Sequence, residues 1–581
     1  MRGLAGNLML RRSANSRSIS TTSTPVLISS ELTYSPSMSL LLAQAFAVVT
    51  GVYLIQRWFL RGQSLKNVPG PPRTSWLKGY FFQLFDASEW KFHDDMLHKY
   101  GGVVRLPMML GKDDLYISDP LALHHILVKD QYIYEETSSF LVSNALTLGL
   151  GLVSTFGDHH RRQRKMLNPV FSMRHMRDLL PVFYPIAYDL RDILLKRVRD
   201  EPKEIDLMSW LSRAALEYIG QAGFGYTFNA LHDEKSSEYG DHVKKTILLI
   251  FKTEFPRRFL PWLVKLGPPA FRRKMLECVP SKLIKEFIES IDRLDDYSKS
   301  IYEKSKRALE KGDEALLKRI GQGKDILSVL LKANMSADEK DRLPEEEIIG
   351  QLNTFTAAGQ DSTSHALSRA LHLLALHPDV QKCLRDEIIA ARTGRGGADF
   401  DYDILMGLPY LDAFCRETLR VFPPVIFLAR TTRKDVIMPL AWPILGADGK
   451  TEITEIPVKR NTNIYISIYG ANRSKKIWGE DAEEWKPERW LNPLPESVSK
   501  AHLPGVYSSM MTFFGGGRAC IGFKFAEMEM KLVLTVLLES LAFEPGPELE
   551  WEMSGITRSV LKNSEDKTPQ LPLKVSLFKG N

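Results

Sequence analysis

Apolar side chains recur with a helical period along most of this chain. Helices are predicted where residues three and four positions apart are apolar, at 89–100, 121–128, 176–195, 205–223 and 344–376. Short apolar runs predict strands at 103–109 and 115–118. No repeat of about 20–50 residues is visible. The pattern predicts a mainly α fold with a small β-rich lobe.

One uncharged stretch precedes this helical region. Residues 38–55 hold about 18 positions without a charge, near the minimum length for a membrane-spanning helix. No base precedes them within about 15–20 residues, whereas bases follow closely at Arg57, Arg61, Lys66 and Arg73. This asymmetry predicts a single-pass anchor at 38–56 with the following domain in the cytosol. A cleaved signal peptide is the alternative.

The segments on either side of this stretch complete the predicted organisation. Residues 1–30 carry four arginines, many serines and threonines and no acid, which is typical of a mitochondrial transit peptide or of a disordered extension. Residues 68–72 read Val-Pro-Gly-Pro-Pro, a stiff hinge because proline fixes φ. No long linker follows Trp76. The prediction is an extension at 1–37, the anchor at 38–56, a basic flank and hinge at 57–75, and one domain at 76–581.

Composition narrows the classes of function. The chain has 581 residues, 44% of them hydrophobic, which is ample for one large core. Its net charge of +7 is modest for this length, and no zinc-finger spacing or aromatic-basic repeat occurs, so no nucleic-acid partner is predicted. The spacing of Cys278, Cys383, Cys415 and Cys520 suits neither a disulfide framework nor a metal knuckle. The first three are predicted to be small buried residues in a reducing compartment.

The chemistry is concentrated near the C-terminus, in the pattern Phe513-x-x-Gly516-x-Arg518-x-Cys520-x-Gly522. Glycines at 515–517 let the backbone approach a flat group closely. Arg518 can donate two parallel hydrogen bonds to a carboxylate. The thiol of Cys520 precedes an apolar helix, where the helix dipole and Arg518 favour its thiolate. Such a thiolate suits a proximal ligand of haem iron.

This motif resembles the haem-binding loop of the cytochrome P450 family of haem-thiolate monooxygenases. Five positions match at the family's spacing, whereas Phe514 stands where glycine is frequent, and the resemblance covers about residues 65–575. It implies the cytochrome P450 fold behind a single N-terminal transmembrane helix, haem b (iron protoporphyrin IX) as cofactor and Cys520 as the axial ligand of its iron. It assigns the other matched positions, Phe513, Gly516, Arg518 and Gly522, to cofactor binding.

The resemblance also assigns the residues that hold the haem propionates. His160 stands where the family has tryptophan, and Arg164, one helical turn later, stands where it has arginine. Histidine keeps a hydrogen-bond donor at this position. Arg430 occupies the position of a second propionate-binding arginine, and Arg518 completes the set. The other bases of 157–165 form either a solvated face or a dock for an acidic electron donor.

A third motif lies in the middle of the predicted helix 344–376, at Asp361, Ser362 and Thr363. Gly359 costs about 1 kcal/mol in a helix interior, and a gap for a diatomic ligand is a reason to keep it. The family carries an acid followed by an alcohol here, and these deliver protons to dioxygen. Asp361 matches the acid and Ser362 the alcohol, with Thr363 as the next hydroxyl, so all three are predicted to be catalytic.

A fourth motif combines Glu417 and Arg420, three residues apart on a predicted helix at 411–421, where they can form an ion pair. Arg489 follows in the run Trp485-x-Pro487-x-Arg489. The resemblance assigns Glu417, Arg420 and Arg489 to a structural triad that holds the haem loop. The strand after Pro424 resembles one that lines the substrate pocket.

An aromatic-rich segment at 255–271 also carries basic residues and four prolines. It is either part of the core or an amphipathic segment that enters the membrane surface at a substrate entrance.

The resemblance implies insertion of one oxygen atom from O2 into an apolar substrate. A mostly apolar pocket is predicted from 140–156, 355–358 and 425–428, which suits a terpenoid, a steroid, a fatty chain or a polycyclic aromatic, in secondary metabolism or xenobiotic oxidation. A haem-thiolate isomerase, dehydratase or peroxygenase on the same fold is one alternative. A non-enzymatic haem or membrane protein is the other.

The predicted partners follow from the same resemblance. No flavin-binding module is evident, so electrons from NADPH are expected through a separate NADPH-cytochrome reductase, with cytochrome b5 as a second donor. Membrane lipid and a small apolar substrate are the other partners. The endoplasmic reticulum membrane is the predicted location, and the mitochondrion is the alternative. Asn334 and Asn472 begin glycosylation patterns that are predicted to be unused in the cytosol.

Overall fold

The computed structural model describes residues 65–232, 238–310, 323–565 and 567–579, together with positions 44, 46 and 48–51. The chain divides into two units, Met1–Leu60 and Arg61–Asn581, and the second holds every element discussed below. Within the described residues, no helix combines the length and the apolar character that a membrane crossing requires. The predicted extension at 1–37 and most of the predicted anchor at 38–56 lie outside the described residues, so both stay predictions.

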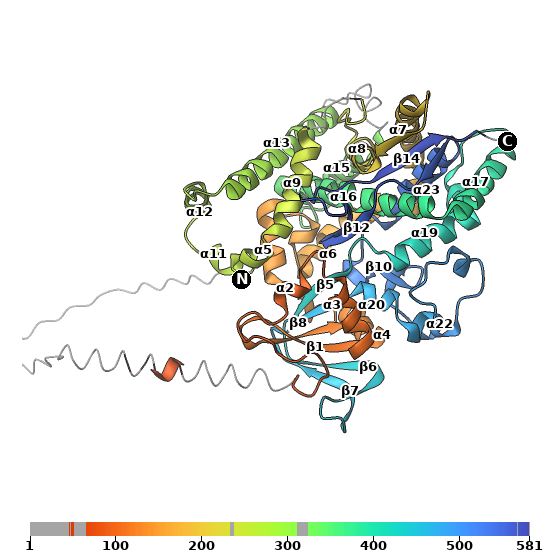
Figure 1. The fold of residues 1–581 in the computed structure, drawn as a ribbon. Helices are drawn as coiled ribbons and strands as arrows, with labels where there is room; N and C mark the ends of the chain where they lie inside the picture. The colour runs from red at the N-terminus through yellow and green to blue at the C-terminus, as the bar shows by residue number, and fades with distance from the viewer. Residues whose placement is uncertain are drawn as a thin grey trace, which may run out of the picture. The chain divides into compact units, whose positions relative to one another are not determined.

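Helices make up most of the second unit (Figure 1). The longest, α16 (Glu345–Leu376), contacts α8 (Leu207–Tyr218), α13 (Lys282–Glu310) and α23 (Phe523–Leu538). The other helices are α2 (Phe81–Leu84), α3 (Trp90–Asp95), α4 (Pro120–His124), α5 (Ser138–Thr147), α6 (Gly157–Leu167), α7 (Met173–Val198), α9 (Glu238–Lys252), α10 (Glu254–Arg257), α11 (Leu260–Leu263), α12 (Pro269–Glu277), α15 (Ile326–Ser336), α17 (Pro378–Thr393), α18 (Tyr402–Gly407), α19 (Pro409–Val421), α20 (Ile468–Asn472), α21 (Lys475–Trp478) and α22 (Glu496–Ala501).

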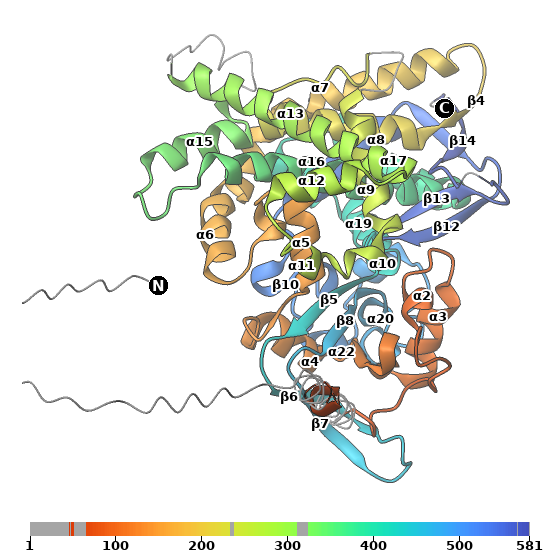
Figure 2. The same ribbon diagram turned by 90° about the vertical axis from the view of Figure 1, so that its left-hand side faces the viewer.

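Small sheets accompany the helices, and the largest lies with α3 and α4 apart from the long helices (Figure 2). Its order is β1 (Val103–Pro107), β2 (Asp113–Ile117), β8 (Asn463–Ser467), β5 (Phe427–Thr432) and β3 (Tyr134–Glu136), and only the β2–β8 pair is parallel. The smaller sheets pair β6 (Val436–Leu445) with β7 (Glu452–Val458), β9 (Gly505–Tyr507) with β10 (Met510–Gly515), β12 (Leu549–Ser554) with β13 (Ile556–Leu561), and β14 (Pro572–Leu577) with both β11 (Leu541–Glu544) and β4 (Lys203–Asp206). The predicted class, mainly α with a small β-rich lobe, is confirmed.

Local sequence explains how α16 begins and where it packs. Pro344 directly precedes the helix and three glutamates fill its first turn, where the partial positive charge of a helix N-terminus favours acids. Further along, Gly350 lies against Gly151, so close that a Cβ on Gly350 would lie 2.6 Å from the backbone nitrogen of Gly151. The helix can therefore pack directly against the loop that leads to α6.

Three predicted helices end in a π-helical turn. The segment 89–100 forms α3 and then η1 (Met96–Tyr100), 121–128 forms α4 and then η3 (His125–Lys129), and 205–223 forms α8 and then η6 (Ile219–Gly223). A π turn is wider than an α-helical turn, and each one here covers only five residues. The spacing of apolar residues changes too little over such a short stretch for the sequence pattern to reveal it. The predicted helices 176–195, 344–376 and 411–421 correspond to α7, α16 and α19, and the predicted strands correspond to β1 and β2.

Candidate active site

The loop that carries Cys520 runs from β10 through the short η9 (Gly516–Arg518) to the start of α23. The N–H of Cys520 donates to the carbonyl of Phe513 at 2.9 Å. A Cβ would lie 2.0 Å from the carbonyl oxygen of Pro504 at Gly515, and 1.7 Å from that of Leu127 at Gly516. Contacts within the chain therefore already require glycine at both positions, and the approach of a flat group stays a prediction.

Cys520 has a different electrostatic neighbour from the one predicted. Its thiol is accessible to solvent but lies deep among protein atoms. Burial raises its pKa, although the N–H of Gly522 and the positive charge of Arg164 act in the opposite direction. The nearby cation is thus Arg164, whereas Arg518 forms an ion pair with Glu135 at 3.1 Å. The N–H of Gly522, at the start of α23, therefore favours the thiolate in the predicted direction, whereas the charge that favours it is that of Arg164 in place of Arg518.

Phe514 stands in the haem-binding loop motif where the family frequently has glycine. Its backbone lies in the left-handed region, with φ +61°, which explains why glycine suits this position. The side chain is nevertheless buried, with 3% of its surface exposed. The guanidinium of Arg430 lies 4.8 Å from its ring centroid. Phenylalanine here combines an unfavourable backbone conformation with core contacts that glycine lacks.

Three arginines converge on the buried ring of His160. Burial and then the charges of Arg518, Arg164 and Arg430 lower the pKa of His160 to about 3. The ring is therefore neutral at physiological pH and keeps one N–H donor. The sequence predicted these four residues as one group, and the structure brings them together.

Each arginine of this group also has a partner within the chain. Arg164 donates to the carbonyl of Ala519 at 2.6 Å, Arg430 pairs with Glu136 at 2.7 Å, and Arg518 pairs with Glu135 at 3.1 Å and donates to the carbonyl of Thr155 at 2.8 Å. Sequence reasoning missed Glu135 and Glu136. Their only signal was two adjacent acids in a short β-forming run.

A cavity of about 310 Å³ lies among these residues. The charged groups in its lining are the cations Arg161, Arg164, Lys165, Arg430 and Arg518 and the anion Glu135, with His160 neutral beside them. Glu136, Asp158 and Asp341, which pair with Arg430, Arg161 and Lys165 from outside the lining, reduce the surplus to one positive charge. The guanidinium groups supply several N–H donors, so the arrangement can bind carboxylates.

The acid-alcohol motif lies on α16, as predicted. The hydroxyl of Ser362 donates to the carbonyl of Ala358 at 2.7 Å, so its oxygen still has lone pairs to accept a hydrogen bond. The carboxylate of Asp361 lies 3.6 Å from Nδ1 of His365. Thr363 is buried. Burial lowers the pKa of Lys244 on α9, and the nearby charges of Asp241 and Asp361 oppose this, which places a cation near Asp361.

The predicted reason for Gly359, a gap for a diatomic ligand, stays a prediction. A Cβ at this position would meet the side chain of Ile219, in η6, at 3.4 Å. The space that this glycine leaves therefore lies beside η6. The small residues that line a cavity on this helix are Ala357 and Ala358.

A second, mostly apolar cavity of about 430 Å³ borders this part of α16. All three predicted segments contribute, through Phe140, Asn144, Leu148, Val153, Ala357, Ala358, Val425, Ile426, Phe427 and Leu428. Phe355 was also predicted to line it, but its ring packs against Phe171, with centroids 5.4 Å apart. Sequence reasoning missed the lining from α9 and from the β12–β13 hairpin, Ile247, Ile250, Phe251, Met553 and Ile556, because long-range folding alone brings them here.

One end of this apolar cavity is charged. Arg257 and Arg258 line it together with Glu254, which pairs with Arg257 at 3.1 Å. Arg258 donates to the hydroxyl of Tyr465 at 3.0 Å. The Nε atoms of both arginines are buried without a hydrogen-bond partner among the described residues.

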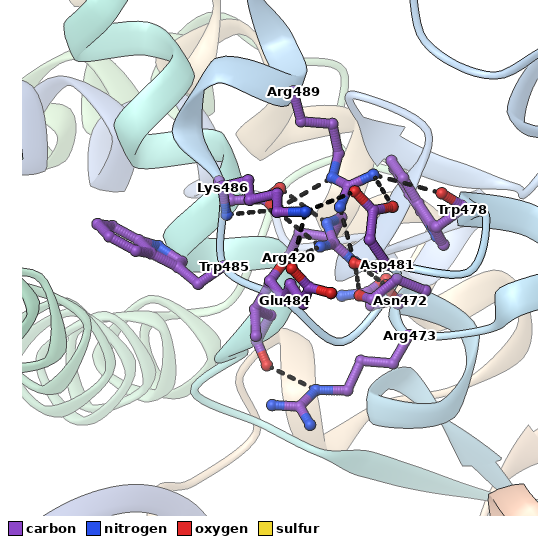
Figure 3. Close-up of polar contacts among 12 residues, drawn as sticks. Arg420, Asn472, Arg473, Trp478, Asp481, Glu484, Trp485, Lys486 and Arg489 are labelled. Atoms are coloured by element: carbon purple, nitrogen blue, oxygen red, sulfur yellow. Dashed lines mark hydrogen bonds and ion pairs between the residues drawn. The ribbon is translucent and has the colours of Figure 1, made fainter.

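Glu417, Arg420 and Arg489 meet as the sequence predicted. Arg420 donates to both oxygens of Glu417, at 2.8 and 2.7 Å, and Nε of Arg489 donates to the same carboxylate at 3.2 Å. Figure 3 shows Arg420 and Arg489 together with Asp481, which accepts from Arg489 at 2.9 Å. Arg420 also donates to the carbonyl of Asn472 at 2.7 Å. The group joins α19 to the segment around η8 (Pro487–Trp490).

The remaining cysteines and the glycosylation patterns are also placed. All four cysteines are free; Cys415 is buried as predicted, whereas Cys278 and Cys383 are exposed. Exposure of these two reflects positions on helix faces that apolar composition does not report. Asn472 is fully buried and its amide donates to Thr512 at 2.8 Å, so it is not a glycosylation acceptor in the folded chain.

Known proteins are similar in sequence to this chain over almost its whole length. The family described as Cytochrome P450 matches residues 69–568. Cytochrome P450 monooxygenase 91 of Postia placenta is 47% identical over 92% of this chain and 99% of its own, and Cytochrome P450 monooxygenase 212 of the same fungus is 47% identical over 89% and 94%. The Ganoderma lucidum protein named Ganoderic acid synthetase CYP5150L8 is 40% identical over 93% and 99%. Together with the fold and the Cys520 loop, these matches show that the chain belongs to the cytochrome P450 family and is a P450 monooxygenase.

Proposed function

We propose that this monooxygenase binds haem b with Cys520 as the axial ligand and oxidises an apolar organic substrate. The family implies a haem-thiolate cofactor, and the donor set fits one. Arg164 lines the cavity that holds a surplus of cations and also acts on Cys520, so a thiol and a site for two carboxylates adjoin each other. When bound, the haem supplies oxygen activation and accepts electrons, and its iron keeps the coordinating thiol deprotonated.

The residues of the chain would bind and orient this group. Cys520 supplies the sulfur, whose negative charge the N–H of Gly522 and the guanidinium of Arg164 stabilise. Arg164, Arg430, Arg518 and neutral His160 would donate hydrogen bonds to the two propionates. A well-formed charge-assisted hydrogen bond contributes about 1.5–3 kcal/mol. The acids Glu135 and Glu136 keep Arg518 and Arg430 in place.

Asp361 and Ser362 would handle protons. The Ser362 oxygen, whose own proton is donated to Ala358, can accept a hydrogen bond from a water molecule. Asp361 would exchange protons with solvent on the side where Lys244 and His365 lie. Successive helix positions point about 100° apart, so the two side chains serve different sides of α16.

The apolar cavity supports a large hydrocarbon-rich substrate. Its walls are largely aliphatic and aromatic, and Arg257, Arg258 and Glu254 at one end would interact with an oxygen-bearing group. A substrate screen includes precursors of ganoderic acid, because a relative that is 40% identical bears that name. Terpenoids, steroids, fatty acids and polycyclic aromatics complete the panel.

The single observation that carries the proposal is the thiol of Cys520 next to the arginine cluster. Cys520→Ala should abolish the thiolate-type Soret band of the ferrous carbon monoxide complex. Cys415→Ala, at another cysteine, should keep it. A normal band in Cys520→Ala would contradict the assignment of the axial ligand.

Proton delivery can be tested by measuring how much oxidised product forms for each NADPH consumed. Ser362→Ala should leave haem content and substrate binding intact but consume NADPH with release of peroxide in place of oxidised product. Thr363→Ala is the control, because Thr363 is buried one position away. Uncoupling by Thr363→Ala alone would assign the role to Thr363. Full coupling in both variants would mean that protons are delivered by another route.

The proposed partners are an NADPH-cytochrome reductase, with cytochrome b5 as a second donor, and the proposed location is the endoplasmic reticulum membrane. The uncharged run at 38–56 and the bases after it support a single-pass anchor with a cytosolic domain. Protease treatment of intact microsomes should digest the domain. A domain protected inside mitochondria would contradict this location.

A further inference from the structure

A third cavity, of about 480 Å³, lies at a different place in the fold. It is bordered by the C-terminal half of α16, the end of α19, α20, α3 and strand β12. Its characteristic lining residues are Trp90, Arg369, Phe422, Tyr469, Arg473 and Trp551. Only Thr557 is shared with the lining of the apolar cavity. Nothing described so far gives this cavity a role.

Arg369 lies between two aromatic rings. Its guanidinium carbon lies 3.3 Å from the ring centroid of Trp551 and 4.4 Å from that of Phe422. Its Nε is buried and has no hydrogen-bond partner within the part of the chain that the structure describes. Among the described residues, no carboxylate forms an ion pair with Arg369. A stacked guanidinium keeps its N–H donors in the plane of the group, so they are directed past the rings.

Arg473 places a second cation against the same ring. Its guanidinium carbon lies 5.6 Å from the centroid of Phe422 and 4.2 Å from that of Tyr469. It donates to the carbonyl of Val421 at 3.0 Å and to the hydroxyl of Tyr469 at 2.7 Å, and this hydroxyl donates to Asp94 at 2.7 Å. Burial and then the charge of Arg473 lower the pKa of Arg369 well below its usual range.

The acids in the lining do not neutralise this pair. Glu550 pairs with Lys567 at 3.2 Å, and Glu552 pairs with Arg558 at 3.1 Å and with Lys567 at 3.4 Å. Arg369, Arg473, Arg558 and Lys567 face Glu550 and Glu552. With Asp94, which binds the hydroxyl of Tyr469, the surplus is one positive charge. Two like charges near each other in a partly closed cavity favour an anion between or beside them.

We propose that this cavity binds a small aromatic carboxylate, independently of the substrate cavity. The guanidinium groups of Arg369 and Arg473 supply donors and charge for the carboxylate. Trp90, Tyr469 and Trp551 supply aromatic walls, which an inorganic anion would leave without contacts. The volume is that of a site for a small organic molecule.

The test uses the full-length holoenzyme, with an azole inhibitor bound at the haem to block the substrate cavity. Isothermal titration calorimetry with 2-naphthoate should detect one site. Arg369→Met and Arg473→Gln should weaken binding at least about tenfold, since each removes a charged hydrogen-bond donor. Arg197→Met is the matched control: Arg197 also stacks on an indole, 4.7 Å from the ring centroid of Trp210, outside this cavity, and its loss should leave the affinity unchanged.

Three further measurements keep the proposal open to refutation. Arg369→Lys retains the charge and should fold, yet it should bind several-fold more weakly because lysine can neither stack nor chelate. Neutral 2-naphthalenemethanol and inorganic phosphate should each bind more weakly than 2-naphthoate. No binding by the wild type up to about 1 mM, equal affinity in Arg369→Lys, or equal affinity for either comparison ligand would overturn the proposal.

Discussion

Phe514 is a residue at which two local effects oppose each other. The left-handed conformation of a non-glycine residue costs about 1–2 kcal/mol, so Phe514→Gly would relieve strain. The same change removes a buried ring, and losing a buried phenylalanine side chain costs about 3–5 kcal/mol. We expect Phe514→Gly to lower the free energy of unfolding by about 1–4 kcal/mol, measured by urea denaturation.

Phe514→Ala separates these two contributions. Alanine loses the ring and the contact with Arg430 but keeps the backbone strain, so it should be less stable than Phe514→Gly by about 1 kcal/mol. If Phe514→Gly were as stable as the wild type, the ring would contribute nothing beyond the strain that it imposes.

The imidazole of His93 makes the free energy of unfolding depend on pH. Burial lowers the pKa of its imidazole from 6.5 to about 4, while Nδ1 lies 2.9 Å from the hydroxyl of Tyr116. Between these pKa values the unfolded chain binds a proton that the folded chain excludes. The stabilising contribution is therefore complete above pH 6.5 and decreases as the pH falls toward 4, by about 1.4 kcal/mol per pH unit.

His93→Phe should remove this contribution to the pH dependence. The hydroxyl of Tyr116 retains the Oγ of Ser467 at 2.9 Å, so the neighbouring polar group is not left unpaired. Urea midpoints at pH 7.5 and pH 5 should differ less in the variant than in the wild type. Other buried histidines titrate equally in both proteins, so equal differences would contradict the assignment to His93.

At the scale of elements, the carboxylate of Glu417 joins α19 to the segment that follows α21. Although burial raises its pKa, the hydrogen bonds and charge of Arg420 outweigh this and hold the pKa of Glu417 below its usual range. Removing one partner leaves a buried charge uncompensated, which costs about 3–5 kcal/mol. Arg420→Met should therefore unfold at a much lower urea concentration, or fail to accumulate as folded protein.

Lys486→Met is the control for this prediction. Lys486 lies in the same segment and pairs with Asp481 and Glu484, but its side chain is 46% exposed. Exposed ion pairs contribute about 0–1 kcal/mol, so this variant should remain near wild-type stability. Similar losses in both variants would mean that the Glu417 group is not specifically important.

Elements were predictable where a long amphipathic pattern determines them. The helices α7, α16 and α19 and the strands β1 and β2 follow from apolar spacing, because burial of one face dominates their energetics. The π turns η1, η3 and η6 were not predictable, since each inserts a single wider turn without a composition signal.

Site residues were predictable where a short motif carries them, and their partners were not. Cys520 could be named from its loop, and Arg164 and Arg430 from the resemblance to the family. The acids could not be named: Glu136 meets Arg430 through the β3–β5 pairing, and Glu135 meets Arg518 from a distant loop. The glycines before Cys520 show the same limit. Their positions were visible in the sequence, whereas the carbonyls of Pro504 and Leu127 that require them come from distant segments.

At the scale of the whole molecule, one exposed surface fits the predicted contact with a membrane. The segment α10–α12 exposes a run of large apolar side chains: Phe259, Trp262, Leu263, Leu266, Phe271 and Met275. Of the two predictions for residues 255–271, this exposure disfavours core packing and agrees with an amphipathic segment. Arg258, stacked 4.4 Å from the ring centroid of Phe81, connects it to the lobe that holds the large sheet.

We therefore expect α11 to enter the interface of the bilayer. Trp262 is 64% exposed, and each large apolar side chain that leaves water contributes up to about 1.5–3 kcal/mol. The test uses full-length protein that carries Trp58→Phe, because Trp58 closely follows the predicted anchor. In nanodiscs that contain brominated lipid, its tryptophan emission should be quenched, and adding Trp262→Phe should remove most of that quenching. Trp551→Phe, at the aromatic carboxylate site, should leave it unchanged. Equal quenching with and without Trp262→Phe would show that the apolar face of α11 remains in water, and would leave the anchor at 38–56 as the only predicted membrane contact.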